Sequence, residues 1–433
     1  MKQFFNRFIY QSLLSVSIFI GMPAKGQPPV SPYKDLIFNK NIRTIELRNP
    51  DFGLSQAILY LNSTGTLKLG FDDLSTEMQS YSYTFIHCNS NWEPSGLLTT
   101  EYIDGFAENA ITDYQFSANT LQKYVHYSAE FPSPAFRFTK SGNYILKVYL
   151  ANSADDAIFT RRFLVVDPKI TATANVHAAS VIEDRNYKQE IDFTVEHPDY
   201  PISNVYSDLK VVVVQNNHWV NARSGLKPQY VKDQQIVYSN DQDNVFSGGN
   251  EFRNINIKSL SYHSERVAQI KQDSFINHVI LLPDEKRSFK AYATEADING
   301  NFVIKAEDAV NKNSDTEADY CTVSFFLPCN EVFTDGNLYV FGGFNGWEFD
   351  PENKLTYDVK RMGYMGNLYL KQGYYNYEYA FLKDDSQEMD ETLIEGSHSV
   401  TENEYAILIY HRFPGTFYDQ LILVKRINSL TGK

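Results

Sequence analysis

Apolar and polar residues alternate with a period of two in many short stretches of the chain. Clear examples are 42–49, 66–74, 81–88, 125–132, 144–152 and 159–168, and turns rich in Asn, Gly and Pro separate many of them. Alternating stretches at a spacing of about 8–12 residues are typical of antiparallel β-sandwiches. We therefore expect an all-β fold made of several β-sandwiches in series.

Three sandwich domains are expected after residue 26. The strand FLVV ends at Asp167-Pro168, and proline cannot continue a central strand, so the first domain is predicted to span 27–167. Its Gly-Asn-Tyr hairpin and the strand that follows resemble the last two strands of an immunoglobulin-like domain. The middle β-rich domain is predicted over 168–317, where LKVVVVQ is apolar enough for a strand buried on both faces. The last domain, 318–433, should open with the strand DYCTVSFFLP.

The first 26 residues have the composition of a secretory signal peptide. Lys2 and Arg7 precede an apolar stretch over 9–20, and Ala24 and Gly26 fit a cleavage pattern of small residues. No cysteine follows the apolar stretch, and no later stretch approaches the roughly 20 apolar residues that a membrane helix needs. We therefore expect an exported protein with no lipid anchor and no transmembrane segment of its own.

The charge and the cysteines exclude two further classes of protein. The formal net charge of the 433-residue chain is −14, and an acidic chain without a long basic cluster argues against nucleic acid as a partner. The three cysteines Cys88, Cys321 and Cys329 are too few for a disulfide framework. Cys321 and Cys329 flank one predicted strand, which holds them beyond the roughly 7 Å between Cα atoms that a disulfide allows. We expect three buried thiols.

The sequence contains no motif of a catalytic or metal site that we can identify. The nine histidines are scattered, none forms HExxH, and His177, His197 and His218 are spaced as successive strands would space them. The segment 297–301, DINGN, begins like a calcium loop but lacks the later bidentate glutamate, so a hairpin turn is expected. We expect no enzyme activity, no catalytic residue, no metal and no cofactor.

The C-terminal quarter of the chain resembles a family of small sugar-binding modules. The motifs GGFNGWEFD and KQGYYNYEYAFL are similar to those of glycogen-binding and early-set β-sandwich modules. The matching residues are Gly343, Phe344, Asn345, Trp347, Gly373, Tyr375, Tyr377 and Phe381. The resemblance implies an early-set-like sandwich in which Trp347 would stack on a sugar face. Alternatively, Trp347 closes the edge of the sandwich, which is the interpretation that we prefer.

A second resemblance covers nearly the whole mature chain. Six uncommon motifs occur in order: FIHCNSNWEPSGLLTTEYIDGF, SGNYILKVYL, TRRFLVVDP, FSGGNEFR, DINGNF and KQGYYNYEYAFL. Together they resemble the plug protein family of the type IX secretion system. The resemblance implies a non-enzymatic periplasmic protein that binds the outer-membrane β-barrel translocon and plugs its periplasmic opening. It would be held at the outer membrane by this protein partner.

Three aromatic residues are our candidates for contact with the translocon. Trp92, Tyr102 and Phe106 lie in or beside a long aromatic-rich stretch for which no core pattern accounts. Trp and Tyr are favoured at the hot spots of protein interfaces. We therefore expect these side chains to be exposed and to bind the partner.

Two other functions remain open at this point. A secreted carbohydrate-binding protein of the α-glucan type would use the C-terminal module and Trp347. A multidomain adhesion or scaffold protein would have neither a sugar ligand nor the translocon as its partner.

Overall fold

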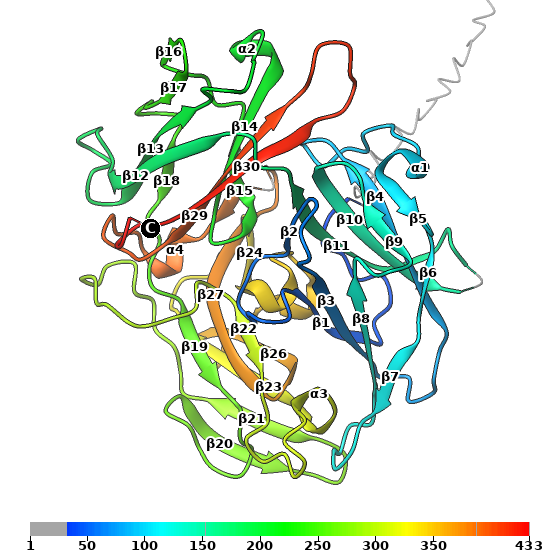
Figure 1. Ribbon diagram of the computed structural model, residues 1–433. Coiled ribbons are helices and arrows are strands. Elements are labelled where there is room, and N and C mark those ends of the chain that lie inside the picture. The colour runs from blue at the N-terminus through cyan, green and yellow to red at the C-terminus, as the bar shows by residue number, and fades with distance from the viewer. Residues whose placement is uncertain (1–32, 152, 387, 433) are drawn as a thin grey trace, which may run out of the picture. The chain divides into compact units, whose positions relative to one another are not determined.

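A computed structural model describes residues 33–151, 153–386 and 388–432. The predicted signal peptide lies outside these ranges. Strands dominate, and every helix is a single turn: α1 Thr99–Tyr102, α2 Val205–Asp208, α3 Ser314–Glu317, α4 Thr392–Glu395 and the 3-10 helices η1 Gly343–Asn345 and η2 Pro351–Asn353. None of these helices has the length and apolar character needed to cross a membrane. The predicted all-β fold is confirmed (Figure 1).

Residues 42–166 form a first sandwich of two sheets. Its strands are β1 Ile42–Arg48, β2 Ile58–Tyr60, β3 Leu67–Asp73, β4 Tyr81–Cys88, β5 Ile103–Gly105, β6 Asn109–Ile111, β7 Asp113–Phe116, β8 Val125–Phe131, β9 Phe136–Phe138, β10 Gly142–Leu150 and β11 Ala157–Val166. One sheet has the order β1-β3-β8-β7 and the other β2-β11-β10-β4-β6, with a β5-β9 ribbon beside them. The Phe71 ring lies 5.4, 5.2 and 5.0 Å from the rings of Tyr81, Tyr127 and Phe159. Aromatic packing thus joins the two sheets.

A second sandwich combines the middle of the chain with its C-terminal end. One sheet contains β12 Thr171–Ala178, β13 Lys188–Glu196, β16 Tyr230–Lys232, β17 Gln235–Tyr238 and β18 Val245–Ser247. The other has the order β15-β14-β29-β30, formed by β14 Leu209–Gln215, β15 His218–Ser224, β29 Glu404–His411 and β30 Gln420–Asn428. Val211 and Val213 face the core between these sheets, whereas Val212 and Val214 pack against the first sandwich. The prediction that LKVVVVQ is buried on both faces is confirmed.

The third sandwich contains the GGFN motif. One sheet is built on β27 Gly373–Lys383, with β19 Arg253–Asn256, β22 Phe302–Ile304, β24 Gly336–Phe341 and β28 Met389–Asp390 paired to it. The other has the order β20-β21-β23-β26-β25, formed by β20 Val267–Gln272, β21 Asn277–Leu281, β23 Tyr320–Pro328, β25 Thr356–Asp358 and β26 Gly363–Lys371. Val323, Phe325, Val340 and Tyr377 belong to the core between them.

The sheets do not divide at the boundary that we expected near residue 317. Strand β14 pairs with β29, β19 and β22 pair with β27, and β21 pairs with β23. Each of these pairs joins a strand from 168–317 to one from 318–433. The alternation of apolar residues locates strands but does not identify their partners. The domain limits, in the sense of units that fold alone, stay a prediction.

The cysteines are free, as expected. Cys88 and Cys321 are buried, but Cys329 is partly exposed, so the expectation of three buried thiols is wrong for Cys329. Burial raises the pKa of the Cys88 thiol to about 12, so this thiol stays protonated and unreactive.

A buried ion pair joins the first sandwich to the third. The ammonium of Lys371, at the end of β26, lies 2.6 Å from Oδ2 of Asp72 on β3, and both side chains are almost completely buried. His126 and Tyr320 also contact the Asp72 carboxylate, at 2.7 and 2.6 Å. Burial alone would raise the pKa of Asp72, but Lys371 and His126 outweigh burial and lower it. The buried carboxylate of Asp72 in the first sandwich and the buried ammonium of Lys371 in the third therefore neutralise each other.

Replacing Lys371 by Met should destabilise the protein strongly, because Asp72 would keep a buried charge without its main partner. We expect a loss of about 3–5 kcal/mol in the free energy of unfolding, measured by urea denaturation. The control is Lys68→Met, which removes a half-exposed ion pair with Asp315 and should cost at most about 1 kcal/mol. Similar losses for the two variants would show that the buried pair does not hold the sandwiches together.

Candidate functional site

Trp92 is buried, in contrast to our expectation. Its side chain is 6% exposed. It meets the Trp219 ring edge-on, with 4.8 Å between the ring centroids, and the Arg162 guanidinium lies 4.4 Å from its ring. Arg162 belongs to β11 of the first sandwich and Trp219 to β15 of the second. Trp92 therefore packs where the two sandwiches meet, an aromatic and cation–π arrangement that leaves little of the ring for a partner.

Tyr102 and Phe106 have opposite environments. Tyr102 is 4% exposed, and its hydroxyl donates a hydrogen bond of 2.9 Å to the carbonyl oxygen of Phe85. The expected exposure of Tyr102 is thus not found either. Phe106 follows strand β5 and is 69% exposed. Of the three candidates, Phe106 alone presents its ring to a partner.

Three contacting segments add further exposed apolar side chains. Leu98, Tyr206 and Phe417 are 70%, 59% and 56% exposed, and we call them the apolar rim. The amide of Arg412 donates to the carbonyl of Asp208 at the end of α2. Phe417 lies close to Gly96, two residues before Leu98, because a Cβ on Gly96 would be 3.8 Å from its ring. α2 and the loop between β29 and β30 lie side by side (Figure 1).

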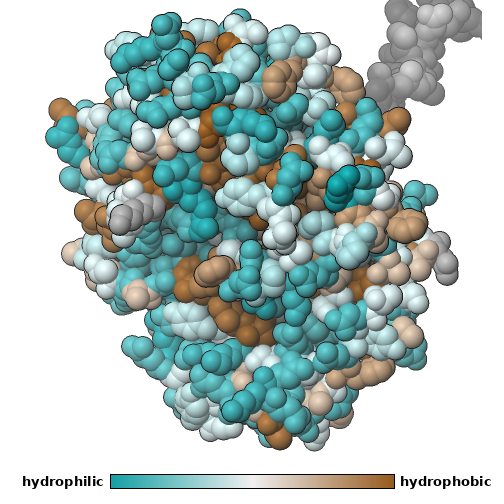
Figure 2. Space-filling view, viewed as in Figure 1, coloured by the Kyte–Doolittle hydropathy of each residue, from teal (hydrophilic) through white to brown (hydrophobic). Residues whose placement is uncertain are grey.

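The surface in Figure 2 mixes apolar and polar residues in small groups. Exposed aromatic and aliphatic residues flanked by polar ones are typical of the surface by which a protein binds another protein. Phe106 and the apolar rim are therefore the candidate interaction surface of this chain.

Trp347 is also buried, at 6% exposed. Its ring stacks on His218, with 4.8 Å between centroids and 21° between planes, and contacts Phe252 and Phe341. It also covers Gly300, where a Cβ would collide with the indole. The expected turn at DINGN is present, with positive φ at Asn299 and Gly300. A sugar ring cannot stack on the indole face that His218 occupies.

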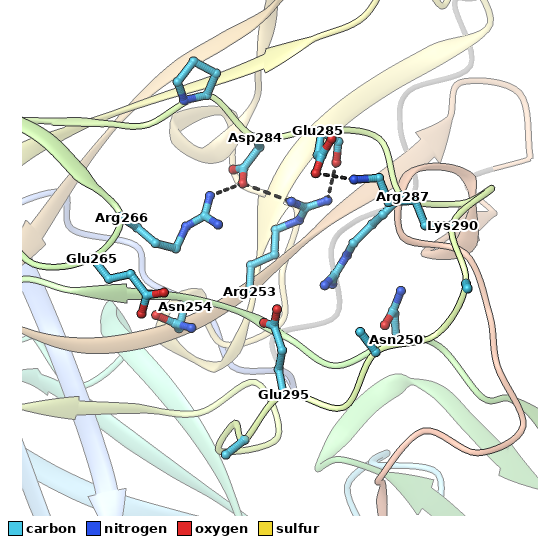
Figure 3. Close-up of a pocket in the computed structure, with 14 residues that line it drawn as sticks. Asn250, Arg253, Asn254, Glu265, Arg266, Asp284, Glu285, Arg287, Lys290 and Glu295 are labelled. Carbon is cyan, nitrogen blue, oxygen red and sulfur yellow. Dashed lines mark hydrogen bonds and ion pairs between the residues drawn. The ribbon is translucent and has the colours of Figure 1, made fainter.

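A pocket of about 770 Å³ lies beside β19. Figure 3 shows that both cationic and anionic side chains surround it. Arg253, the last residue of the FSGGNEFR motif, donates to Asp284 at 3.0 Å and to Glu395 at 2.9 Å. All three are almost completely buried. The charges are paired with one another, so they fix loops in place.

The side chains of this pocket are mainly charged groups that bind one another. The described residues that line it include four cations, Arg253, Arg266, Arg287 and Lys290, but no serine, cysteine or histidine. Asp284 accepts hydrogen bonds of 2.6 Å from both Tyr377 and Tyr379. A serine or cysteine nucleophile with an adjacent histidine base is therefore not formed by these described lining residues.

Two groups of side chains bring three possible metal ligands within 4.8 Å of one another. They are His177, Glu190 and Asp192, and Glu251, Asp297 and Glu402. In the second group, burial raises the pKa of Asp297 to about 6, while the amides of Asn299 and Phe252 oppose this rise and Glu251 and Glu402 add to it. The sequence showed neither group, because register and tertiary folding bring the residues together.

A pair of buried carboxyls lies next to His218. A cavity of about 20 Å³, enough for one water, is lined by His218, Glu378 and Glu391 among others. Burial raises the pKa of Glu391 to about 7, with Asp390 adding to the rise and Arg223 opposing it. Burial, followed by Glu391 itself, also raises the pKa of Glu378. Burial and mutual repulsion therefore favour the protonated forms of these two carboxyls.

The Glu391 carboxyl should make stability depend on pH. The folded state keeps its proton up to about pH 7, whereas the unfolded state loses it near pH 4.5, so the wild type gains stability as pH falls between these values. Glu391→Gln should therefore be more stable than the wild type at pH 8, by about 1–3 kcal/mol, and similar to it at pH 5. Urea unfolding at both pH values measures this, with exposed Glu183→Gln as the control. An equal effect of Glu391→Gln at both pH values would contradict it.

Trp92→Ala should lower the free energy of unfolding by about 3–5 kcal/mol, because it empties a buried aromatic site between two sandwiches. Phe106→Ala should change it by less than about 0.5 kcal/mol, since an exposed side chain loses few contacts. Thermal or urea unfolding of both variants checks this. A small loss for Trp92→Ala would mean that the contact between the two sandwiches is weak.

A comparison with known protein families finds a match in the first sandwich. A family profile described as "Type 9 secretion system plug protein 1st domain" matches residues 42–167, the same strands that form the first sandwich. The crystal structure of a hypothetical protein from Parabacteroides merdae ATCC 43184 is similar over 92% of this chain and 100% of that chain, with 31% identity and a TM-score of 0.88. None of the curated proteins matches significantly.

These comparisons do not confirm the resemblance of the C-terminal part to early-set and glycogen-binding modules, which stays a prediction. The resemblance to the plug proteins is supported independently by the profile match over residues 42–167. This chain belongs to the plug protein family of the type IX secretion system.

Proposed function

We propose that this protein is a non-enzymatic periplasmic component of the type IX secretion system, which binds the outer-membrane translocon barrel and plugs its periplasmic opening. The observation that carries the proposal is the match of residues 42–167 to the first domain of the plug proteins. The sequence pattern of a secretory signal peptide supports a location in the periplasm.

The packing of the sandwiches supports a role as a rigid body. The first and second sandwiches share a core that includes Cys88, Trp92, Val212 and Tyr410. The Tyr410 hydroxyl donates to Oδ1 of Asn143 at 2.7 Å, across the same contact. A plug must resist deformation by the pore that it closes, and large apolar contacts with internal polar bonds limit the relative motion of domains.

The paired charges of the pocket beside β19 support a role without catalysis. Arg253 is held by Asp284 and Glu395, and such a buried network stabilises the arrangement of loops. Phe106 and the apolar rim supply an exposed surface for the partner. Their aromatic rings offer a large contact area at a low cost in side-chain entropy.

Phe106→Asp and Phe417→Asp should reduce the amount of translocon barrel that co-purifies with the protein, because a carboxylate would have to be desolvated in an apolar contact. We expect at least a fivefold loss for one of these variants. Phe275→Asp, which changes an 82% exposed ring in the turn between β20 and β21, is the matched control and should bind normally. The measurement is affinity purification from native membranes, followed by quantification of the barrel.

Two results would count against the proposal at different levels. If the barrel does not co-purify with the wild-type protein, the plug function itself is wrong. If the barrel is recovered equally with all three variants, the function stands but the interaction surface lies elsewhere. The unfolding curve of each variant should match that of the wild type, which shows that a loss of binding does not result from misfolding.

A further inference from the structure

Three side chains that could bind a metal ion lie together on the outer face of the second sandwich. In the antiparallel pair of β12 and β13, His177 stands opposite Glu190 and Asn175 stands opposite Asp192. Opposite residues, and residues two apart on one strand, project from the same face of a sheet. His177, Glu190 and Asp192 therefore lie together, with their ligand atoms within 4.8 Å of one another.

A backbone hydrogen bond fixes the orientation of the His177 ring. Its Nδ1 lies 2.8 Å from the carbonyl oxygen of Ala178. A carbonyl can only accept, so Nδ1 carries a proton and Nε2 of the neutral ring has a free lone pair. This Nε2 lies 3.2 Å from Oδ2 of Asp192. Without a metal ion, a proton on Nε2 forms a hydrogen bond with this carboxylate, and a metal ion at the same place would replace that proton. A backbone carbonyl that fixes the second ring nitrogen is the usual partner of a histidine that binds a metal.

The two carboxylates lack other compensation. Glu190 is 3% exposed and accepts a hydrogen bond from the amide of Ser180 at 2.7 Å. Among the described residues, the ion pair of Asp192 is with His177, and no lysine or arginine forms one with Glu190. Oδ1 of Asp192 is buried and has no hydrogen-bond partner. A buried carboxylate beside a half-buried one with an orphaned oxygen is an environment that a divalent cation stabilises.

We propose that His177, Glu190 and Asp192 bind a zinc ion. Zinc–ligand bonds of about 2.0–2.1 Å in a tetrahedral arrangement place ligand atoms about 3.3 Å apart, and the Nε2–Oδ2 separation is 3.2 Å. One imidazole with two carboxylates suits zinc better than calcium, which prefers six to eight oxygen ligands. A surface depression beside Asp192, lined by Thr173 and Asn175 among others, leaves room for a water as the fourth ligand.

The ion would tie an edge strand to its neighbour. β12 is the last strand of its sheet, since the order is β12-β13-β17-β16. Glu190 also holds the loop at Ser180, so one ion would link β12, β13 and the loop between them. This inference does not depend on the proposed plug function.

The test is calorimetric titration of the full-length protein, without a histidine tag, with ZnCl₂ at pH 7.5. We expect one equivalent to bind, and His177→Ala and Asp192→Asn to weaken binding at least tenfold. His278→Ala is the matched control. Its Nε2 lies 3.0 Å from the Asp273 carboxylate, but it belongs to neither of the groups with three ligands, so its binding should equal that of the wild type.

Thermal unfolding separates metal binding from a purely structural role. In EDTA, the isosteric Asp192→Asn variant should remain folded, and ZnCl₂ should raise the Tm of the wild type but not that of the variant. Wild-type protein that does not bind ZnCl₂ would overturn the proposal, as would equal binding by wild type, His177→Ala and Asp192→Asn. Tighter binding of CaCl₂ than of ZnCl₂ at these residues would overturn the assignment to zinc.

Discussion

The ion pair between Asp72 and Lys371 is the constraint on which the arrangement of the sandwiches depends. Each charge is buried, and each is provided by a different sandwich. A buried charge without its partner costs several kcal/mol, so neither surface is satisfied unless the other is in its place and correctly oriented. Lys371 also lies 4.3 Å from the ring of Tyr124, which adds a cation–π contact from the first sandwich. The pair therefore determines orientation more than it adds net stability.

A second buried and compensated carboxylate lies at the contact between the first and second sandwiches. The carboxylate of Asp419, completely buried, accepts from the Ser90 amide at 3.0 Å and from Lys210 and Arg412 at 3.0 and 2.7 Å. Apolar packing around Trp92 supplies the contact area, and these polar groups select one register of the two surfaces. Apolar packing is not directional, whereas hydrogen bonds to a charged carboxylate are.

The sequence predicted the strands well and the assembly poorly. Alternation located β14 and β23, and turn chemistry located the bend at Asn299 and Gly300, because these depend on neighbours along the chain. The burial of Trp92 depends on Arg162 and Trp219, which are distant in sequence and unmarked by any pattern. His177 comes close to Glu190 and Asp192 only through the register of two strands. For the same reason, spacing gave no indication of a metal-binding group.

The pairing of β14 with β29 affects how the chain can fold as it is made. Val212 pairs with Leu408, and the whole third sandwich lies between them in the sequence. Strand β14, which is apolar on both faces, therefore stays unpaired along the edge that binds β29 until nearly the last residues have been synthesised. Contacts of such high sequence separation form slowly, and an open apolar edge invites pairing with another chain. Protection of this strand by a chaperone would reduce such mispairing, and loss of the last thirty or so residues would leave the second sandwich incomplete.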